Sequence, residues 1–184
     1  TPACRLPKGK ADPAFRTKPQ IAVELVDKAL SAGVEFRAVV ADSAYGDSIG
    51  FVETFLAEGL PFVLGMKPSK GTWSLSEEAH TPEEAAMELH WDGEDSPGDW
   101  TKVTRRFRDG HEELWWAAEL AFGPYGPDKR LHMVVATTDP EKLPPLTTWY
   151  LVTKLPRPGS LLAQDSLPQS ADLAEIGRLY GLRS

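Results

Sequence analysis

An alternation of helical and strand-like segments over residues 19–66 constrains the fold of this chain most strongly. Residues 19–32 repeat apolar side chains at the three- and four-residue spacing of an amphipathic helix, and residues 46–58 do so again. Residues 36–41 and 60–66 are continuous apolar runs, which is typical of strands buried on both faces. Short connections between such elements favour parallel pairing of neighbouring strands. The pattern therefore predicts an α/β fold built as helix, strand, helix, strand.

The character of the chain changes after residue 66. Residues 67–99 are polar and acidic, with one short helical pattern at 82–89. Four strand-like runs follow, at residues 100–107, 114–121, 131–137 and 149–153. Asp109-Gly110 between the first two is typical of a hairpin turn. We expect this part to be β-rich and antiparallel, with its tryptophans mainly in the core. A final helical pattern begins at Ala171 and runs to the end of the sequence, which suggests a truncated helix.

Composition and charge exclude several classes of protein. With 184 residues, 41% hydrophobic and 26% charged, the chain has the make-up of a globular protein of one domain, or of a small domain with an insertion. No apolar run is long enough to span a bilayer, so we expect no membrane association. A single cysteine, Cys4, excludes a disulfide framework and favours a reducing, cytoplasmic setting. The four histidines are scattered, which argues against a histidine-based metal site.

The net charge of −7 comes from one segment of the chain. Residues 77–99 contain nine acidic residues and no lysine or arginine. A basic strip follows directly and consists of Lys102, Arg105, Arg106 and Arg108. The strip is either a DNA-facing surface or an ordinary solvated strand.

Asp42 is the strongest single candidate for chemistry. It ends a predicted buried strand, and α/β sheets place ligands at the carboxyl ends of their strands. The alternative is a structural role, in which Asp42 caps the helix that follows. One carboxylate cannot hold a catalytic Mg²⁺, which takes several oxygen ligands. A catalytic Asp42 therefore needs partners from elsewhere.

Several segments, in their order along the chain, resemble DDE transposases, and most closely the IS701-type group of the broad IS4-like superfamily. The segments are residues 15–19 (FRTKP), 41–47 (ADSAYGD), 115–120 (WWAAEL), 136–140 (ATTDP), 147–153 (TTWYLVT) and 173–183 (LAEIGRLYGLR). The resemblance implies an RNase H-like core in which two Asp and one Glu bind two divalent metals for DNA cleavage and strand transfer. The resemblance implies Mg²⁺ as the cofactor, with Mn²⁺ as its substitute.

The resemblance also assigns residues, partners and domains. Asp42 takes the part of the second catalytic Asp and metal ligand, and Tyr180 and Arg183 take the part of the Tyr and Arg that hold the DNA backbone. The partners are transposon-end DNA and a second copy of the enzyme, in the bacterial cytoplasm. The chain divides into an irregular lead-in (1–18), a partial RNase H-like core (19–66), a β-rich insertion (67–160) and a return to the core with the start of the terminal catalytic helix, which is cut short (161–184).

Two departures from the family pattern shape what we expect. The pattern needs a Glu four positions after Arg183, where this sequence has ended, and a first Asp on a strand before residue 19. We therefore expect a transposase fragment that is inactive alone, with an apolar sheet edge at the 36–41 or 62–66 strand. One alternative is a self-contained acidic α/β interaction module without catalysis. Another is a small metal-dependent hydrolase, in which acids of the 77–99 segment fold back onto Asp42.

Overall fold

The computed structural model describes residues 9–71, 81–107, 109–120, 131–159 and 170–182. It divides into two compact units, Thr1–Phe36 and Arg37–Ser184. Helix α1 (Lys18–Ser31) belongs to the first unit and confirms the first predicted helix. Thr17 and Gln20 form a capping box at its start, in which each side chain accepts a hydrogen bond from the other residue's backbone N–H. Gly33 follows the helix with a φ of 74°, a left-handed conformation that glycine adopts without strain.

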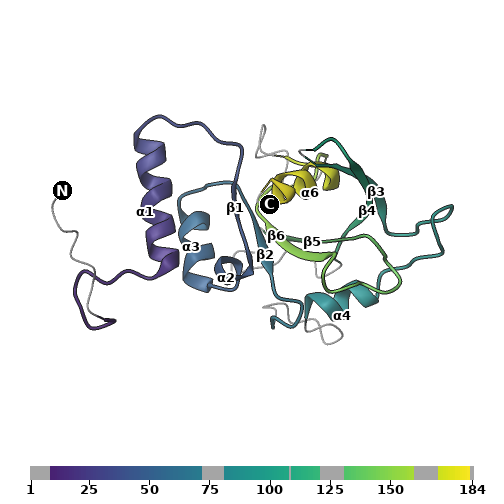
Figure 1. Ribbon diagram of the computed structural model, residues 1–184, viewed down its shortest axis with the longest axis horizontal. Helices are drawn as coiled ribbons and strands as arrows, with labels where there is room; N and C mark the ends of the chain where they lie inside the picture. The colour runs from purple at the N-terminus through teal and green to yellow at the C-terminus, as the bar shows by residue number, and fades with distance from the viewer. Residues whose placement is uncertain (1–8, 72–80, 108, 121–130, 160–169, 183–184) are drawn as a thin grey trace. The chain divides into compact units, whose positions relative to one another are not determined.

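Six strands of the second unit form one mixed sheet in the order β1-β2-β6-β5-β4-β3. They are β1 (Val39–Ala41), β2 (Phe62–Met66), β3 (Thr101–Arg106), β4 (Glu112–Glu119), β5 (His132–Thr137) and β6 (Thr148–Thr153). β1 and β2 pair in parallel, and every other neighbouring pair is antiparallel (Figure 1). The predicted α/β class and both predicted strand directions are confirmed.

Strand β2 joins the two regions that the sequence distinguishes. It pairs with β1 on one side and with β6 on the other, so strands from both sides of residue 67 share a single sheet. All five residues of β2 are buried. The division into a core and an insertion at residues 66–67 stays a prediction, and its boundary falls within a continuous sheet.

Two details of the predicted helix–strand alternation are wrong. The strand predicted over residues 36–41 covers only Val39–Ala41, and its residues are half-buried because β1 is the end strand and has a neighbour on one side only. The helix predicted from Gly46 is two helices, α2 (Ser43–Gly46) and α3 (Ile49–Ala57). The first begins earlier than expected because the side chain of Asp42 caps it.

The main core lies between the sheet and helix α6 (Leu173–Gly181). Inward-facing residues of β2, β4, β5 and β6 meet one face of this helix, in a cluster that includes Val63, Trp115, Leu151 and Ile176. Asp172 caps α6 by accepting a hydrogen bond from the backbone N–H of Glu175 at 2.7 Å. The expectation that the tryptophans are mainly core residues is confirmed for the buried Trp100, Trp115 and Trp116.

Other elements pack against the rest of the sheet. Helix α4 (Pro82–Met87) contacts β5, and Figure 1 shows α4 and α6 on opposite sides of the sheet. Phe51 and Phe55 of α3 stack edge to face with centroids 4.5 Å apart, and the ring of Phe62 on β2 lies 6.3 Å from that of Phe55. Among the described residues, no helix has both the length and the apolar character needed to cross a membrane.

Candidate functional site

Asp42 directly follows the last residue of β1. Its Oδ1 accepts a hydrogen bond of 3.0 Å from the backbone N–H of Ala44, which makes it the N-cap of α2. The structural interpretation of Asp42 as a helix cap is therefore confirmed. A capping hydrogen bond uses one oxygen, and a carboxylate has two oxygens with about four lone-pair positions. Capping is thus compatible with a further role as a metal ligand.

Two glycines set the position of the Asp42 turn against β2. A Cβ added at Gly46 would overlap the carbonyl oxygen of Gly65 and would lie 3.2 Å from the Cβ of Leu64. A Cβ added at Gly65 would overlap the hydroxyl of Tyr180 and would lie 3.1 Å from the backbone nitrogen of Ser43. Only glycine fits where two backbones approach this closely. The turn is therefore clamped against β2.

A second carboxylate, Asp47, lies at the same end of the sheet. Its Oδ2 is 3.3 Å from the Nζ of Lys67, and its Oδ1 accepts a hydrogen bond of 3.3 Å from the backbone N–H of the same lysine. The Nζ of Lys70 donates to the carbonyl oxygen of Asp47 at 2.9 Å. Two lysines therefore hold Asp47 at the carboxyl end of β2, and a metal ion there would have to compete with them.

The described residues do not assemble a complete metal site. They contain no group of three or more His, Cys, Asp or Glu side chains placed to hold one ion. Asp42 fits a divalent metal as a single oxygen ligand and needs others to complete the shell. The hydrolase alternative needed acids of the 77–99 segment beside Asp42, and the described members of that segment do not form such a cluster. Glu77 and Glu78 lie outside the described residues.

The structure describes one of the two residues that were predicted to hold DNA. Tyr180 lies in α6 and is buried, with 5% of its surface exposed, and its ring packs 5.1 Å from that of Trp149. Its hydroxyl lies beside Gly65 of β2, the strand against which the Asp42 turn packs. Arg183 lies outside the described residues. Contact of either residue with DNA stays a prediction.

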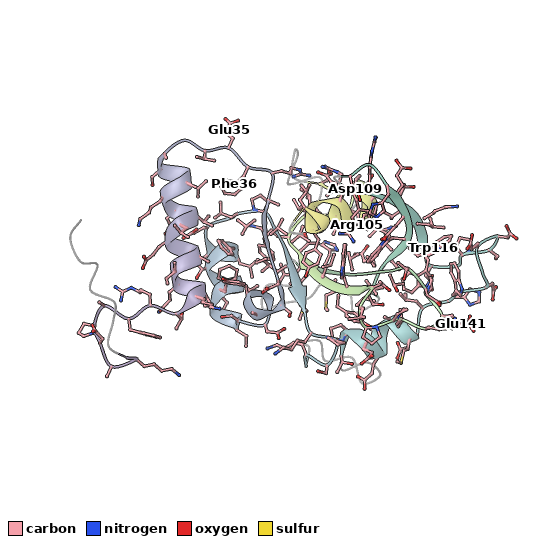
Figure 2. The ribbon with its side chains drawn as sticks, in the orientation of Figure 1. Glu35, Phe36, Arg105, Asp109, Trp116 and Glu141 are labelled. Atoms are coloured by element: carbon pink, nitrogen blue, oxygen red, sulfur yellow. The ribbon has the colours of Figure 1, made fainter. Side chains whose placement is uncertain are left out.

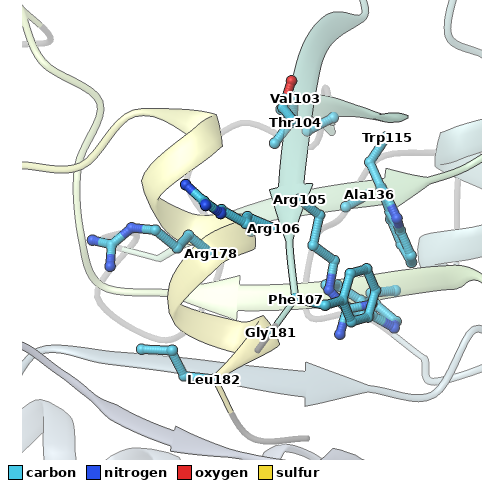
Figure 3. Close-up of a pocket in the computed structure, with 13 residues that line it drawn as sticks. Val103, Thr104, Arg105, Arg106, Phe107, Trp115, Ala136, Arg178, Gly181 and Leu182 are labelled. Carbon is cyan, nitrogen blue, oxygen red and sulfur yellow. The ribbon is translucent and has the colours of Figure 1, made fainter. Parts of the chain in front are cut away.

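The basic strip splits into two kinds of side chain. Lys102 and Arg106 are exposed, while Arg105 is half-buried against aromatic rings beside α6 (Figure 2). Arg108 lies outside the described residues. Sequence reasoning missed that Arg105 and Arg106 share a pocket with Trp149 and Arg178, which are far apart along the chain (Figure 3). The local signal was the run of basic residues from Lys102 to Arg106, followed by the aromatic Phe107.

Comparison with known proteins agrees with this architecture. Residues 2–116 match the family of DDE superfamily endonucleases. The chain belongs to this family, and the resemblance seen in the sequence is confirmed.

Similarity to one known protein indicates the group within this family. The chain is 31% identical over 176 residues to a probable transposase for insertion sequence element IS701 from Microchaete diplosiphon. The similarity covers 95% of this chain and 38% of that relative, so the chain spans less than two fifths of the relative's length. The match supports the IS701 type, and it does not favour the alternative of an interaction module without catalysis.

Proposed function

We propose that this chain is part of the catalytic region of a DNA transposase and supplies Asp42 as a ligand to a divalent metal. The observation that carries the proposal is the position of Asp42, at the carboxyl end of a strand in a chain of the DDE endonuclease family. Such strand ends are where α/β sheets place their ligands. The close packing of Gly46 and Gly65 supports a turn that must be held rigidly.

The chemistry follows from what a carboxylate can do for phosphoryl transfer. Asp42 would hold a Mg²⁺ ion, or Mn²⁺ in its place, with the oxygen positions that capping leaves available. When bound, such an ion would supply activation of the attacking hydroxyl and compensation of the negative charge on the phosphoryl oxygens. Tyr180 would hold the DNA backbone near this turn together with Arg183, and the position of the Tyr180 hydroxyl beside Gly65, on the strand that the turn contacts, supports that role.

We further propose that the chain does not cleave DNA by itself. Its described residues bring no second and third carboxylate to Asp42, and one carboxylate cannot position two metals. Incubation of the purified chain with supercoiled plasmid and Mg²⁺ or Mn²⁺ should leave the plasmid intact. Nicking that depends on Asp42 would disprove this part of the proposal.

The role of Asp42 is tested in the longest reading frame that contains this chain, expressed as one protein. Asp42→Asn keeps a good helix cap and removes the negative charge. We expect it to lower cleavage of transposon-end DNA by about 10³-fold, because a metal supplies several kcal/mol of transition-state stabilisation. Asp172→Asn is the matched control, since Asp172 also caps a helix, α6, and has no proposed metal role. Equal losses of cleavage in both variants would show that Asp42 acts only as a helix cap.

The remaining expectations are also proposals. We infer that the partners are transposon-end DNA and a second copy of the enzyme, and that the setting is the bacterial cytoplasm. The similarity to an IS701 transposase supports the DNA partner. Analytical ultracentrifugation with and without end DNA tests the dimer, which should appear at least on the DNA.

A further inference from the structure

A short turn after β2 carries two lysines at the same edge of the sheet as Asp42. Because β1 and β2 are parallel, their carboxyl ends lie at one edge (Figure 1). Asp42 comes directly after the last residue of β1, and Lys67 comes directly after the last residue of β2. The backbone nitrogen of Ser43 approaches Gly65, two residues before Lys67. The lysine turn, residues 67–70, therefore begins next to the turn that Asp42 starts.

Hydrogen bonds hold the lysine turn in one shape. The backbone N–H of Lys70 donates to the carbonyl oxygen of Lys67 at 3.1 Å, which closes a β-turn with Pro68 at its second position. Proline is favoured at this position because its fixed φ suits the turn. The carbonyl oxygen of Pro68 accepts a hydrogen bond of 3.2 Å from the backbone N–H of Glu83 in α4. The two lysines are therefore presented on a segment that is braced between β2 and α4.

Asp47 ties the lysine turn to the helix that Asp42 caps. It directly follows α2, and its side chain is only 16% exposed. Its carboxylate contacts both the backbone N–H and the Nζ of Lys67, and its carbonyl oxygen accepts a hydrogen bond from the Nζ of Lys70. The contact with the backbone N–H would be enough to brace the turn. The other two contacts draw both ammonium groups toward the edge of the sheet that carries Asp42.

Both ammonium groups keep the capacity to bind an anion. An ammonium has three N–H donors, and each lysine uses at most one of them in its contact with Asp47. The side chain of Lys67 is 65% exposed. Lys70 donates to a neutral carbonyl oxygen and forms no ion pair within the part of the chain that the structure describes. Two ammonium groups thus share one carboxylate, and one positive charge is left over for a ligand.

We propose that the lysine turn is a phosphate-binding element in which Lys67 and Lys70 hold the sugar-phosphate backbone of DNA beside Asp42, with Asp47 as the positioning residue for Lys67. This inference rests on the proposed function for the identity of the ligand, and it names side chains that hold the substrate next to the metal ligand. Lysine binds phosphate as a compact point charge. Contacts of this kind position DNA without reading its sequence.

Glutamine variants of the two lysines test the site in the longest reading frame that contains this chain. Binding of a fluorescein-labelled duplex is followed by anisotropy at several salt concentrations in EDTA, so that a metal at Asp42 plays no part. Lys67→Gln and Lys70→Gln should each weaken binding several-fold and reduce the slope of log K against log salt by about 1. A duplex of unrelated sequence should show the same losses, because phosphate contacts carry no sequence information.

Lys142→Gln is the matched control for the lysine variants. Lys142 is 74% exposed, and its Nζ lies 3.1 Å from the Oδ2 of Asp139, so this variant also leaves an aspartate without its lysine. It should bind the duplex like the wild type. An equal loss of affinity in Lys142→Gln would show diffuse charge attraction and overturn the site.

Asp47→Asn separates positioning from net charge. The variant loses a negative charge, so diffuse attraction alone predicts tighter binding of DNA. Positioning predicts weaker binding, because Lys67 loses its ion pair, and it predicts no further loss when Lys67→Gln is added. The amide oxygen of asparagine can still accept the backbone N–H of Lys67, so the turn itself is kept. Asp139→Asn is the control and should not weaken binding. Unchanged or tighter binding in Asp47→Asn, or additive losses in the double variant, would overturn the positioning role.

Failure of this inference and failure of the proposed function give different results. Normal duplex binding in both lysine variants, together with loss of cleavage in Asp42→Asn, would remove the lysine turn alone. Weaker binding in the lysine variants without any Asp42-dependent cleavage would remove the catalytic function and leave a turn that binds DNA.

Discussion

Asp42 and Arg105 lie toward opposite ends of the same sheet, and their surroundings are built differently. Asp42 follows a three-residue end strand, and backbone groups surround it: a helix N-terminus, Gly46 and Gly65. Arg105 belongs to a six-residue strand, and side chains from other strands surround it. Local backbone geometry defines the first site, whereas long-range packing of side chains defines the second. The two sites should therefore respond to different substitutions.

The largest effect should come from adding a methyl group at Gly46. Gly46→Ala forces a Cβ into the carbonyl oxygen of Gly65, so α2 must move away from β2. We expect a loss of about 3 kcal/mol in the free energy of unfolding, at the upper end of overpacking costs. Denaturant unfolding followed by circular dichroism measures it. Arginine–aromatic contacts at the other end of the sheet should stay intact before unfolding, as judged by tryptophan fluorescence.

Gly50→Ala is the control for this substitution. Gly50 lies in α3, and nothing approaches within 4 Å of the position of an added Cβ. Alanine is the better helix former, so this variant should gain up to about 1 kcal/mol. A Gly46→Ala protein as stable as the wild type would mean that the Asp42 turn is not clamped, and the contrast between the two ends would weaken.

The same contrast explains what the sequence could predict. Asp42 was found because its signals are local: an apolar run, a carboxylate and the start of a helix within a few residues. The parallel β1–β2 pair followed from the same short-range pattern. The pocket was not found, because Arg105, Trp149 and Arg178 come together only through the register of β3 to β6 and the seating of α6. The pairing of β2 with β6 was missed for the same reason, because no local sequence pattern identifies antiparallel partners that are far apart along the chain.

A smaller effect on stability is expected at Glu119, a carboxylate whose neighbours differ from those of Asp42. Its Oε1 lies 2.7 Å from the Nδ1 of His132 and its Oε2 lies 2.9 Å from a guanidinium nitrogen of Arg157. Burial raises the pKa of Glu119, but the hydrogen bond and charge of His132 and the charge of Arg157 outweigh it and hold the pKa below its ordinary value of 4.5. Asp42 has no such pair of cationic neighbours among the contacts described for it.

The sign of the pH dependence follows from that shift. A carboxyl whose pKa is lower in the folded state contributes stability that is complete above its unfolded pKa and is lost as the pH falls through its folded pKa. Glu119→Gln should therefore cost about 1–2 kcal/mol at pH 7, and the difference from wild type should shrink as the pH falls below about 4.5. Urea unfolding at a series of pH values measures it. A difference that is constant with pH would show that the ion pairs do not stabilise the fold.

The smallest effect concerns α6, which contacts both ends of the sheet. Close to β1, the Nε of Arg37 lies 2.8 Å from the Oε1 of Glu175, and an Nη of Arg37 donates to the carbonyl oxygen of Ser170 at 2.8 Å. Because both side chains are about one third exposed or less, solvent screens the pair, and a double-mutant cycle of Arg37→Gln and Glu175→Gln should give a coupling of about 0.5–1 kcal/mol.

The Arg16–Glu24 pair beside α1 is the matched comparison, since its side chains are about half exposed, at 48% and 51%. It should show a smaller coupling, and both couplings should fall as salt rises. Couplings of equal size in the two pairs would show that the partial burial of Arg37 and Glu175 does not strengthen their ion pair.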